Sequence, residues 1–137
     1  MKLLSLMLIL TGLFLPHMGQ AENLIEIRAL SQEGDSLAVN QDQHLSYYFG
    51  SVPLHTRPVV TYKVSNNSDK PLGVKGITLS GAGFDQYNNC PSVLEARKYC
   101  LTRIAFWPHW IGPHLGHLVW ALEDGNIFLN LWGDGVQ

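Results

Sequence analysis

Apolar and polar residues alternate in short runs along most of the chain, and Gly, Pro, Asn and Asp interrupt these runs repeatedly. Beyond the apolar N-terminal stretch, no helical period of apolar residues is sustained. Val60, Tyr62 and Val64, for example, fall on one face of a single extended segment. This pattern is typical of sheets with one buried face, and it predicts an all-β immunoglobulin-like sandwich of about seven strands.

The expected strands can be placed along the chain from the same alternation. They fall within residues 24–30, 45–49, 58–64, 72–79, 100–106, 118–122 and 127–131. Glu123-Asp124-Gly125-Asn126 predicts a tight turn that joins the last two strands as a hairpin. Gly76 is expected to mark a β-bulge, and the polar residues 31–43 a loop.

The N-terminus has the features of a secretory signal peptide. Lys2 precedes an apolar stretch, Leu3–Leu15, that is too short to span a bilayer, and Gly19-Gln20-Ala21 gives a small-residue end. We expect cleavage after Ala21; a retained membrane anchor is the alternative. Nothing later in the sequence is apolar for long enough to cross a membrane.

These features divide the chain into three parts. Residues 1–21 are the expected signal peptide, residues 22–44 an N-terminal strand and polar segment, and residues 45–137 one immunoglobulin-like domain. The expected location is the bacterial periplasm, or the cell surface or medium after secretion. The net charge of −2 and the lack of a basic block exclude the positive footprint that nucleic acid requires.

The two cysteines, Cys90 and Cys100, indicate one disulfide in an exported protein. Their spacing lacks the short knuckle and second pair of a structural zinc site. The sequence contains no G-x-S-x-G, H-E-x-x-H, P-loop or C-x-x-C pattern, and its carboxylates are scattered. We therefore expect no enzymatic activity and no cofactor. Asn66-Asn67-Ser68 fits a glycosylation acceptor, which a bacterial-looking signal makes a chance match.

Several short segments together resemble a known family. They are Phe49-Gly50-Ser51-Val52-Pro53, Asn66-Asn67, Ile77-Thr78-Leu79-Ser80-Gly81, Phe84, Asn89-Cys90-Pro91, Leu94, Cys100, Phe106, Pro108, Gly112, Gly116, Leu118 and Leu131-x-Gly133-x-Gly135. Their order and spacing over residues 45–136 resemble the choice-of-anchor D type repeat. That group is similar to the ASPM/SPD-2/Hydin (ASH) domains and to major sperm protein and PapD-like sandwiches.

The resemblance implies a non-catalytic binding or scaffolding module. It also implies that Cys90 and Cys100 are the family's paired cysteines. The resemblance further implies that the family's turn glycines correspond to Gly81, Gly112, Gly116, Gly133 and Gly135. Arg97 stands where the family often has a glycine.

A second departure from the family lies between Phe106 and Gly116. Where family members carry mostly Thr, Ser and small residues, this chain has Trp107, His109, Trp110, Ile111 and His114.

This aromatic segment is the candidate site, and four interpretations of it remain open. Trp107, His109, Trp110 and His114 form a candidate surface for a protein partner, because tryptophans are enriched at binding hot spots. His109, His114 and His117 are weak metal candidates, since His114 and His117 should leave opposite faces of one strand. A glycan platform would also need polar neighbours such as Asn88, Asn89 or Asp85. Alternatively, the tryptophans only cap the end of the sandwich.

The favoured hypothesis is a non-catalytic exported module that binds protein or has a structural role. Its setting would be a bacterial envelope assembly, such as a secretion system, pilus or adhesion apparatus. Docking would use the aromatic segment or strand addition at an open sheet edge. The alternative is a periplasmic protein that binds a glycan or a metal through residues 107–117.

Overall fold

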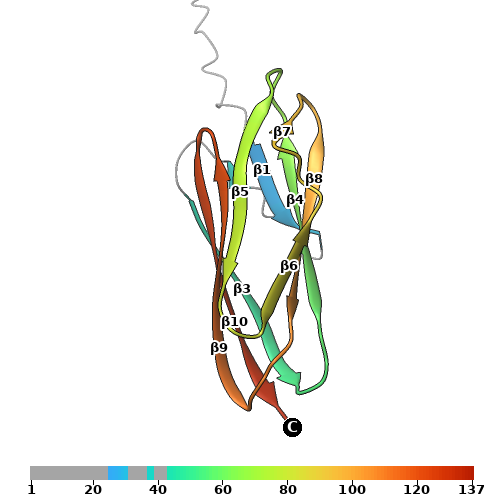
Figure 1. Cartoon of the computed structure of the whole chain (residues 1–137), viewed down its shortest axis with the longest axis vertical. Coiled ribbons are helices and arrows are strands. Elements are labelled where there is room, and N and C mark those ends of the chain that lie inside the picture. The colour runs from blue at the N-terminus through green and yellow to red at the C-terminus, as the bar shows by residue number, and fades with distance from the viewer. Residues whose placement is uncertain (1–24, 31–36, 39–42) are drawn as a thin grey trace, which may run out of the picture.

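Two β-sheets face each other and form an elongated sandwich (Figure 1). The computed structural model describes residues 25–30, 37–38 and 43–137. The expected signal peptide, residues 1–21, lies outside the described residues, as does most of the polar segment 31–43. No helix occurs in the described residues, so none there is long and apolar enough to span a membrane. The predicted all-β sandwich is confirmed.

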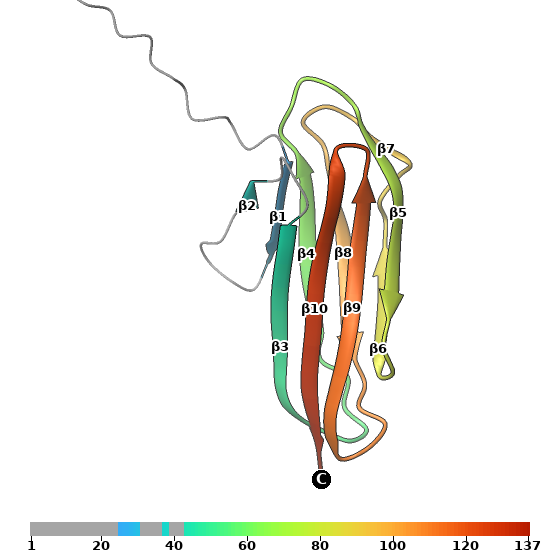
Figure 2. The same ribbon diagram turned by 90° about the vertical axis from the view of Figure 1, so that its left-hand side faces the viewer.

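In the described ranges, each sheet contains five strands. The first, called here the β4–β8 sheet, has the order β2 (Leu37–Ala38), β1 (Ile25–Ala29), β4 (Val59–Asn66), β8 (Tyr99–Phe106) and β6 (Phe84–Asn88). The second, the β9–β10 sheet, has the order β3 (Gln43–Pro53), β10 (Gly125–Val136), β9 (Gly112–Leu122), β5 (Leu72–Ser80) and β7 (Val93–Leu94). Figure 2 shows β3, β10, β9 and β5 side by side. Among the strands that the structure describes, β3 and β10 are the one pair that runs parallel.

All seven expected strands are present, and three short ones, β2, β6 and β7, are added. β2 and β7 contain two residues each, too few to show alternation, and the sequence of β6, Phe-Asp-Gln-Tyr-Asn, does not alternate between apolar and polar residues. β1 pairs with β4 from Ile25 to Ala29, so this N-terminal strand is part of the same sandwich. The predicted bulge at Gly76 is confirmed by a shift of register against β9. The predicted hairpin is also confirmed, since Gly125 pairs with Leu122.

The core lies between the sheets and is filled by alternate residues of both. Trp120 of β9 and Thr102 of β8 are fully buried, and the Trp120 indole donates a hydrogen bond to the Thr102 hydroxyl at 3.0 Å. This bond joins the two layers through the core. It also satisfies the indole N–H, which would otherwise be buried without a partner.

Of the five glycines that the family resemblance identifies as turn glycines, Gly112 is the first residue of β9, with a φ of 116°, and three others lie in strand interiors. Gly116 is in β9, and Gly133 and Gly135 are in β10. Each leaves space for a neighbour: a Cβ at Gly116 would lie 2.6 Å from Phe84, and one at Gly133 would overlap the Phe106 ring. Their role is therefore close packing between the layers. Gly81, with a φ of 115°, is in a turn, as expected.

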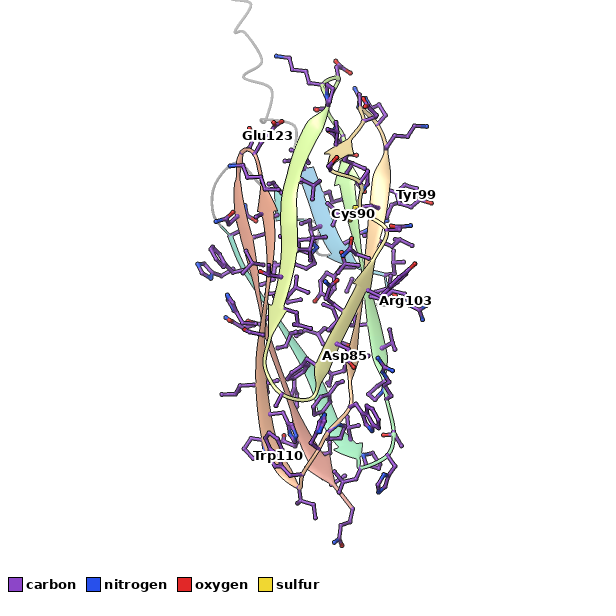
Figure 3. All side chains as sticks on the ribbon, in the orientation of Figure 1. Asp85, Cys90, Tyr99, Arg103, Trp110 and Glu123 are labelled. Carbon is purple, nitrogen blue, oxygen red and sulfur yellow. A yellow bond between two sulfur atoms is a disulfide. The ribbon has the colours of Figure 1, made fainter. Side chains whose placement is uncertain are left out.

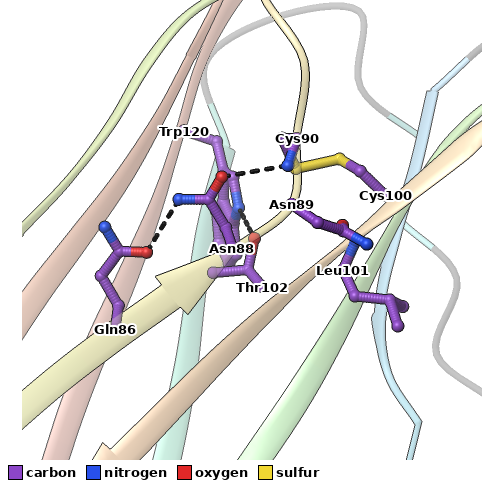
Figure 4. The surroundings of a disulfide bond; sticks show 8 residues. All are labelled: Gln86, Asn88, Asn89, Cys90, Cys100, Leu101, Thr102 and Trp120. Atoms are coloured by element: carbon purple, nitrogen blue, oxygen red, sulfur yellow. Dashed lines mark hydrogen bonds between the residues drawn. A yellow bond between two sulfur atoms is a disulfide. The ribbon is translucent and has the colours of Figure 1, made fainter.

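Cys90 and Cys100 form the predicted disulfide, with their Cα atoms 4.9 Å apart. Figure 4 shows Asn88 accepting a hydrogen bond from the Cys90 backbone N–H, and Asn89 lying beside the bridge. Within the enclosed loop Arg97 has a φ of 64°, the left-handed conformation in which glycine is favoured. The loop therefore keeps the backbone shape that a glycine would give.

Replacing Thr102 with Val should destabilise the protein by about 1–3 kcal/mol, because the buried Trp120 N–H loses its acceptor. Thr78→Val is the matched control, since Thr78 lies exposed on β5 and should change stability by at most about 0.5 kcal/mol. Urea unfolding of both variants measures the difference. Equal stability of the two would show that the bond between the layers contributes little.

Candidate functional site

A loop from Trp107 to Ile111 closes one end of the sandwich (Figures 1 and 3). It leaves β8 in one sheet and enters β9 in the other. The Trp107 N–H donates to the Gly83 carbonyl at 2.7 Å, which ties the loop to the β5–β6 turn. Trp107 and Trp110 are each 47 % exposed, and Ile111 is 55 % exposed. The loop therefore presents three large apolar side chains to solvent while its backbone is anchored.

His114 lies beneath this loop and is only 1 % exposed. Its Nε2 accepts a hydrogen bond from the His109 backbone N–H at 3.1 Å, and its Nδ1 lies 3.0 Å from the Gly112 carbonyl oxygen. Because Nε2 accepts, Nδ1 must carry the proton and donate to Gly112. Trp110 stacks on the imidazole with 3.9 Å between ring centroids. His114 thus holds the loop by two hydrogen bonds and a stacked ring.

This arrangement changes the expected role of His114. A ring with both nitrogens bonded to backbone groups has no lone pair for a metal and no surface for a partner. His114 therefore positions the loop, and the expectation that it touches a partner directly does not agree with its burial. Trp107, His109 and Trp110 are exposed, as a contact surface requires.

The three histidines of the metal hypothesis are not brought together. His109 is exposed in the loop, His114 is buried, and His117 bonds Asn130 on the outer face of the β9–β10 sheet at 3.0 Å. Across the described parts of the chain, no group of three or more His, Cys, Asp or Glu side chains is placed to hold a metal. The polar neighbours of the glycan hypothesis have other partners. Asn88 accepts from the Cys90 N–H and Asn89 from the Leu101 N–H, and Cys90 lies far from Trp110 in Figure 3. Asp85 pairs with Arg57.

Strand β10 and the β5–β6 turn pack tightly against the loop. A Cβ added at Gly135 of β10 would overlap the Trp110 carbonyl oxygen and lie 3.0 Å from the Pro108 side chain. A Cβ at Gly83, which has a φ of 88°, would lie 3.0 Å from both His114 and the Trp107 carbonyl oxygen. The shape of the loop therefore depends on glycines distant in sequence.

Sequence reasoning missed a group of aromatic residues on the outer face of the β9–β10 sheet. Tyr48 stacks on Trp132 at 5.5 Å, and Leu115, opposite Trp132 on β9, is 76 % exposed. The Tyr48 hydroxyl donates to Asp134 at 2.6 Å, and this bond raises the pKa of Tyr48. Trp132 faces outward because it follows the buried Leu131 in β10, and Tyr48 joins it through the parallel pairing of β3 with β10.

A hollow of about 330 Å³ on the outer face of the β4–β8 sheet was also missed. Arg57, Asp85, Tyr87 and Arg103 line it with Val59 and Ala105. These residues come from β4, β6, β8 and the segment before β4, so no local sequence pattern connects them.

No family model matches the chain, and no curated protein matches it in sequence. Solved structures do match in shape. A PapD-like (ASH) domain of human CEP192 is 12% identical over 93% of this chain and 96% of that one, with a TM-score of 0.55. A Porphyromonas gingivalis W83 protein of unknown function is 14% identical over 80% of this chain and 65% of that one, with a TM-score of 0.55.

Secreted proteases of Vibrio cholerae also contain a region of this shape. VesB is 15% identical over 66% of this chain, with a TM-score of 0.53, and this chain spans only 30% of VesB. This chain spans only 21% of the length of VesC, a secreted serine protease. At such identities the matches show the fold alone, a PapD-like β-sandwich.

Replacing Gly135 with Ala should displace the loop and destabilise the protein by about 1–3 kcal/mol, because the new methyl group overlaps the Trp110 carbonyl. Gly76→Ala is the control, since no atom lies within 4 Å of its added Cβ. Thermal unfolding and the NMR shift of the Trp110 indole N–H report stability and loop position. Unchanged values for Gly135→Ala would show that the loop does not pack against β10 as described.

Proposed function

We propose that the protein is a non-catalytic, exported binding module that joins a larger assembly of the bacterial envelope through its end loop. The observation that supports this most is the pair of half-exposed tryptophans, Trp107 and Trp110, beside the exposed Ile111. Such side chains gain much apolar burial on binding, and tryptophan is enriched among residues that dominate binding energy. The resemblance to choice-of-anchor D repeats is consistent with this role.

The backbone of the loop is already held in place before any partner binds. His114 accepts and donates hydrogen bonds within it, and Trp107 bonds to Gly83. A preorganised loop loses little conformational entropy on association, so more of its burial energy contributes to affinity. The Cys90–Cys100 disulfide is consistent with an oxidising compartment outside the cytoplasm, to which the expected signal peptide would direct the chain.

In-cell crosslinking tests the proposal. A photoreactive residue at position 111, with its side chain exposed beside both tryptophans, should give a specific crosslinked product in the envelope fraction. Trp107→Ala and Trp110→Ala should each weaken capture about tenfold or more, as loss of a hot-spot residue does. Mass spectrometry of the product identifies the partner.

Tyr99→Ala is the matched control, because Tyr99 is 59 % exposed on the β4–β8 sheet, away from the loop. It should leave the crosslinking unchanged. Recovery of only the free chain, or equal capture by the Trp107→Ala and Tyr99→Ala variants, would contradict the proposal.

A further inference from the structure

The outer face of the β4–β8 sheet differs in charge from the rest of the molecule. Although the whole chain has a net charge of −2, the described residues of this face include four cationic side chains and two carboxylates. The cations are Arg28, Lys63, Arg103 and Arg57, and the carboxylates are Glu26 and Asp85. Figure 3 shows Arg103 and Tyr99 projecting from this outer side.

Arg28 lies 3.5 Å from Glu26 and Arg57 pairs with Asp85, whereas Lys63 and Arg103 have no carboxylate partner in the described residues. Lys63 of β4 lies directly opposite Arg28 of β1, a like-charge pair that destabilises a sheet. Lys63 is placed over the Tyr99 ring at 4.3 Å. Arg103 is exposed, and no carboxylate in the described residues lies within ion-pair distance of it.

Arg103 lines the hollow on this face. It sits between Tyr87 of β6 and Thr61 of β4. The adjacent row is Asp85, Ala105 and Val59, in which the short Ala105 side chain leaves the floor open. The hollow therefore has guanidinium groups at its wall, an apolar floor and the phenol of Tyr87, which is 72 % exposed.

The second guanidinium of the hollow is only weakly engaged. Arg57 pairs with Asp85 at 3.1 Å, and both side chains are more than half exposed, at 54% and 62%. An exposed ion pair of this kind contributes little and exchanges readily. Arg57 can therefore turn from Asp85 to an incoming anion, while Asp85 opposes that anion by repulsion.

We propose that this hollow binds a phosphate ester, with Arg103 and Arg57 on the phosphate oxygens and the ester's organic part over Val59 and Ala105. Guanidinium groups match phosphate oxygens in geometry and charge. A volume of about 330 Å³ leaves space for a group larger than the phosphate itself. The site is independent of the end loop, because it lies on a sheet face and shares no residue with the loop.

Titration of the oxidised mature protein with glycerol 3-phosphate, followed by NMR, tests the site. The amide signals of Arg57, Tyr87 and Arg103 should shift together, with a dissociation constant of about 1 mM or below. Arg103→Gln should weaken binding about tenfold, as the loss of a charge-assisted hydrogen bond does. Lys75→Gln, which removes an equal charge from β5 of the other sheet, should weaken it less than about twofold.

Asp85→Asn gives a prediction of the opposite sign. Removing this carboxylate frees Arg57 and eliminates repulsion, so the variant should bind the phosphate ester several-fold more tightly. A merely structural role for Asp85 would give unchanged or weaker binding. Unchanged or weaker binding by Asp85→Asn, or equal losses in Arg103→Gln and Lys75→Gln, would overturn the proposal.

Vesicles of phosphatidylglycerol, with phosphatidylcholine vesicles as the control, distinguish the source of the phosphate. Tighter binding to phosphatidylglycerol than to the soluble ester, lost in Arg103→Gln, assigns the site to a lipid headgroup aided by Lys63 and Arg28. Binding of glycerol 3-phosphate alone assigns it to a soluble ester. Binding of neither, or stronger binding of acetate than of the phosphate ester, overturns the proposal.

Discussion

The buried imidazole of His114 is the constraint on which the candidate site depends. It joins the start of β9 to the loop backbone by accepting from His109 and donating to Gly112, and Trp110 covers its ring. Without His114, the His109 N–H and the Gly112 carbonyl would need other hydrogen-bond partners at this end of the sandwich. The histidine thus fixes the conformation of the solvent-exposed loop that carries Trp107 and Trp110.

The groups that stabilise the sandwich are different from those that its surface offers to a partner. Its layers are held by apolar side chains, the Trp120–Thr102 bond and strand glycines that admit Phe84 and Phe106. None of these groups is needed at the surface. The end loop and the two outer faces are therefore free to differ: the loop is apolar, the β4–β8 face is cationic, and the β9–β10 face carries stacked aromatic rings.

The fold was largely predictable because alternation is strong in long strands such as β9 and β10, and the disulfide followed from a single cysteine pair. β6 was not predictable, because its sequence, Phe-Asp-Gln-Tyr-Asn, does not alternate between apolar and polar residues. The loop was identifiable from its composition, but the role of His114 was not. Its partners are backbone atoms, and its burial depends on how the loop folds over it. The Arg103 hollow assembles across strands that are distant in sequence.

Long-range ¹H–¹⁵N NMR of the histidine side chains tests the central claim most directly, because it reports which ring nitrogen carries the proton. For His114 the account predicts the neutral Nδ1–H tautomer, with Nε2 unprotonated and its signals unaffected by added Zn²⁺. The ring of His109 is exposed, so its nitrogen signals should instead be averaged by exchange with solvent. An Nε2–H tautomer for His114, or a shift of its ring signals on addition of Zn²⁺, would contradict the account.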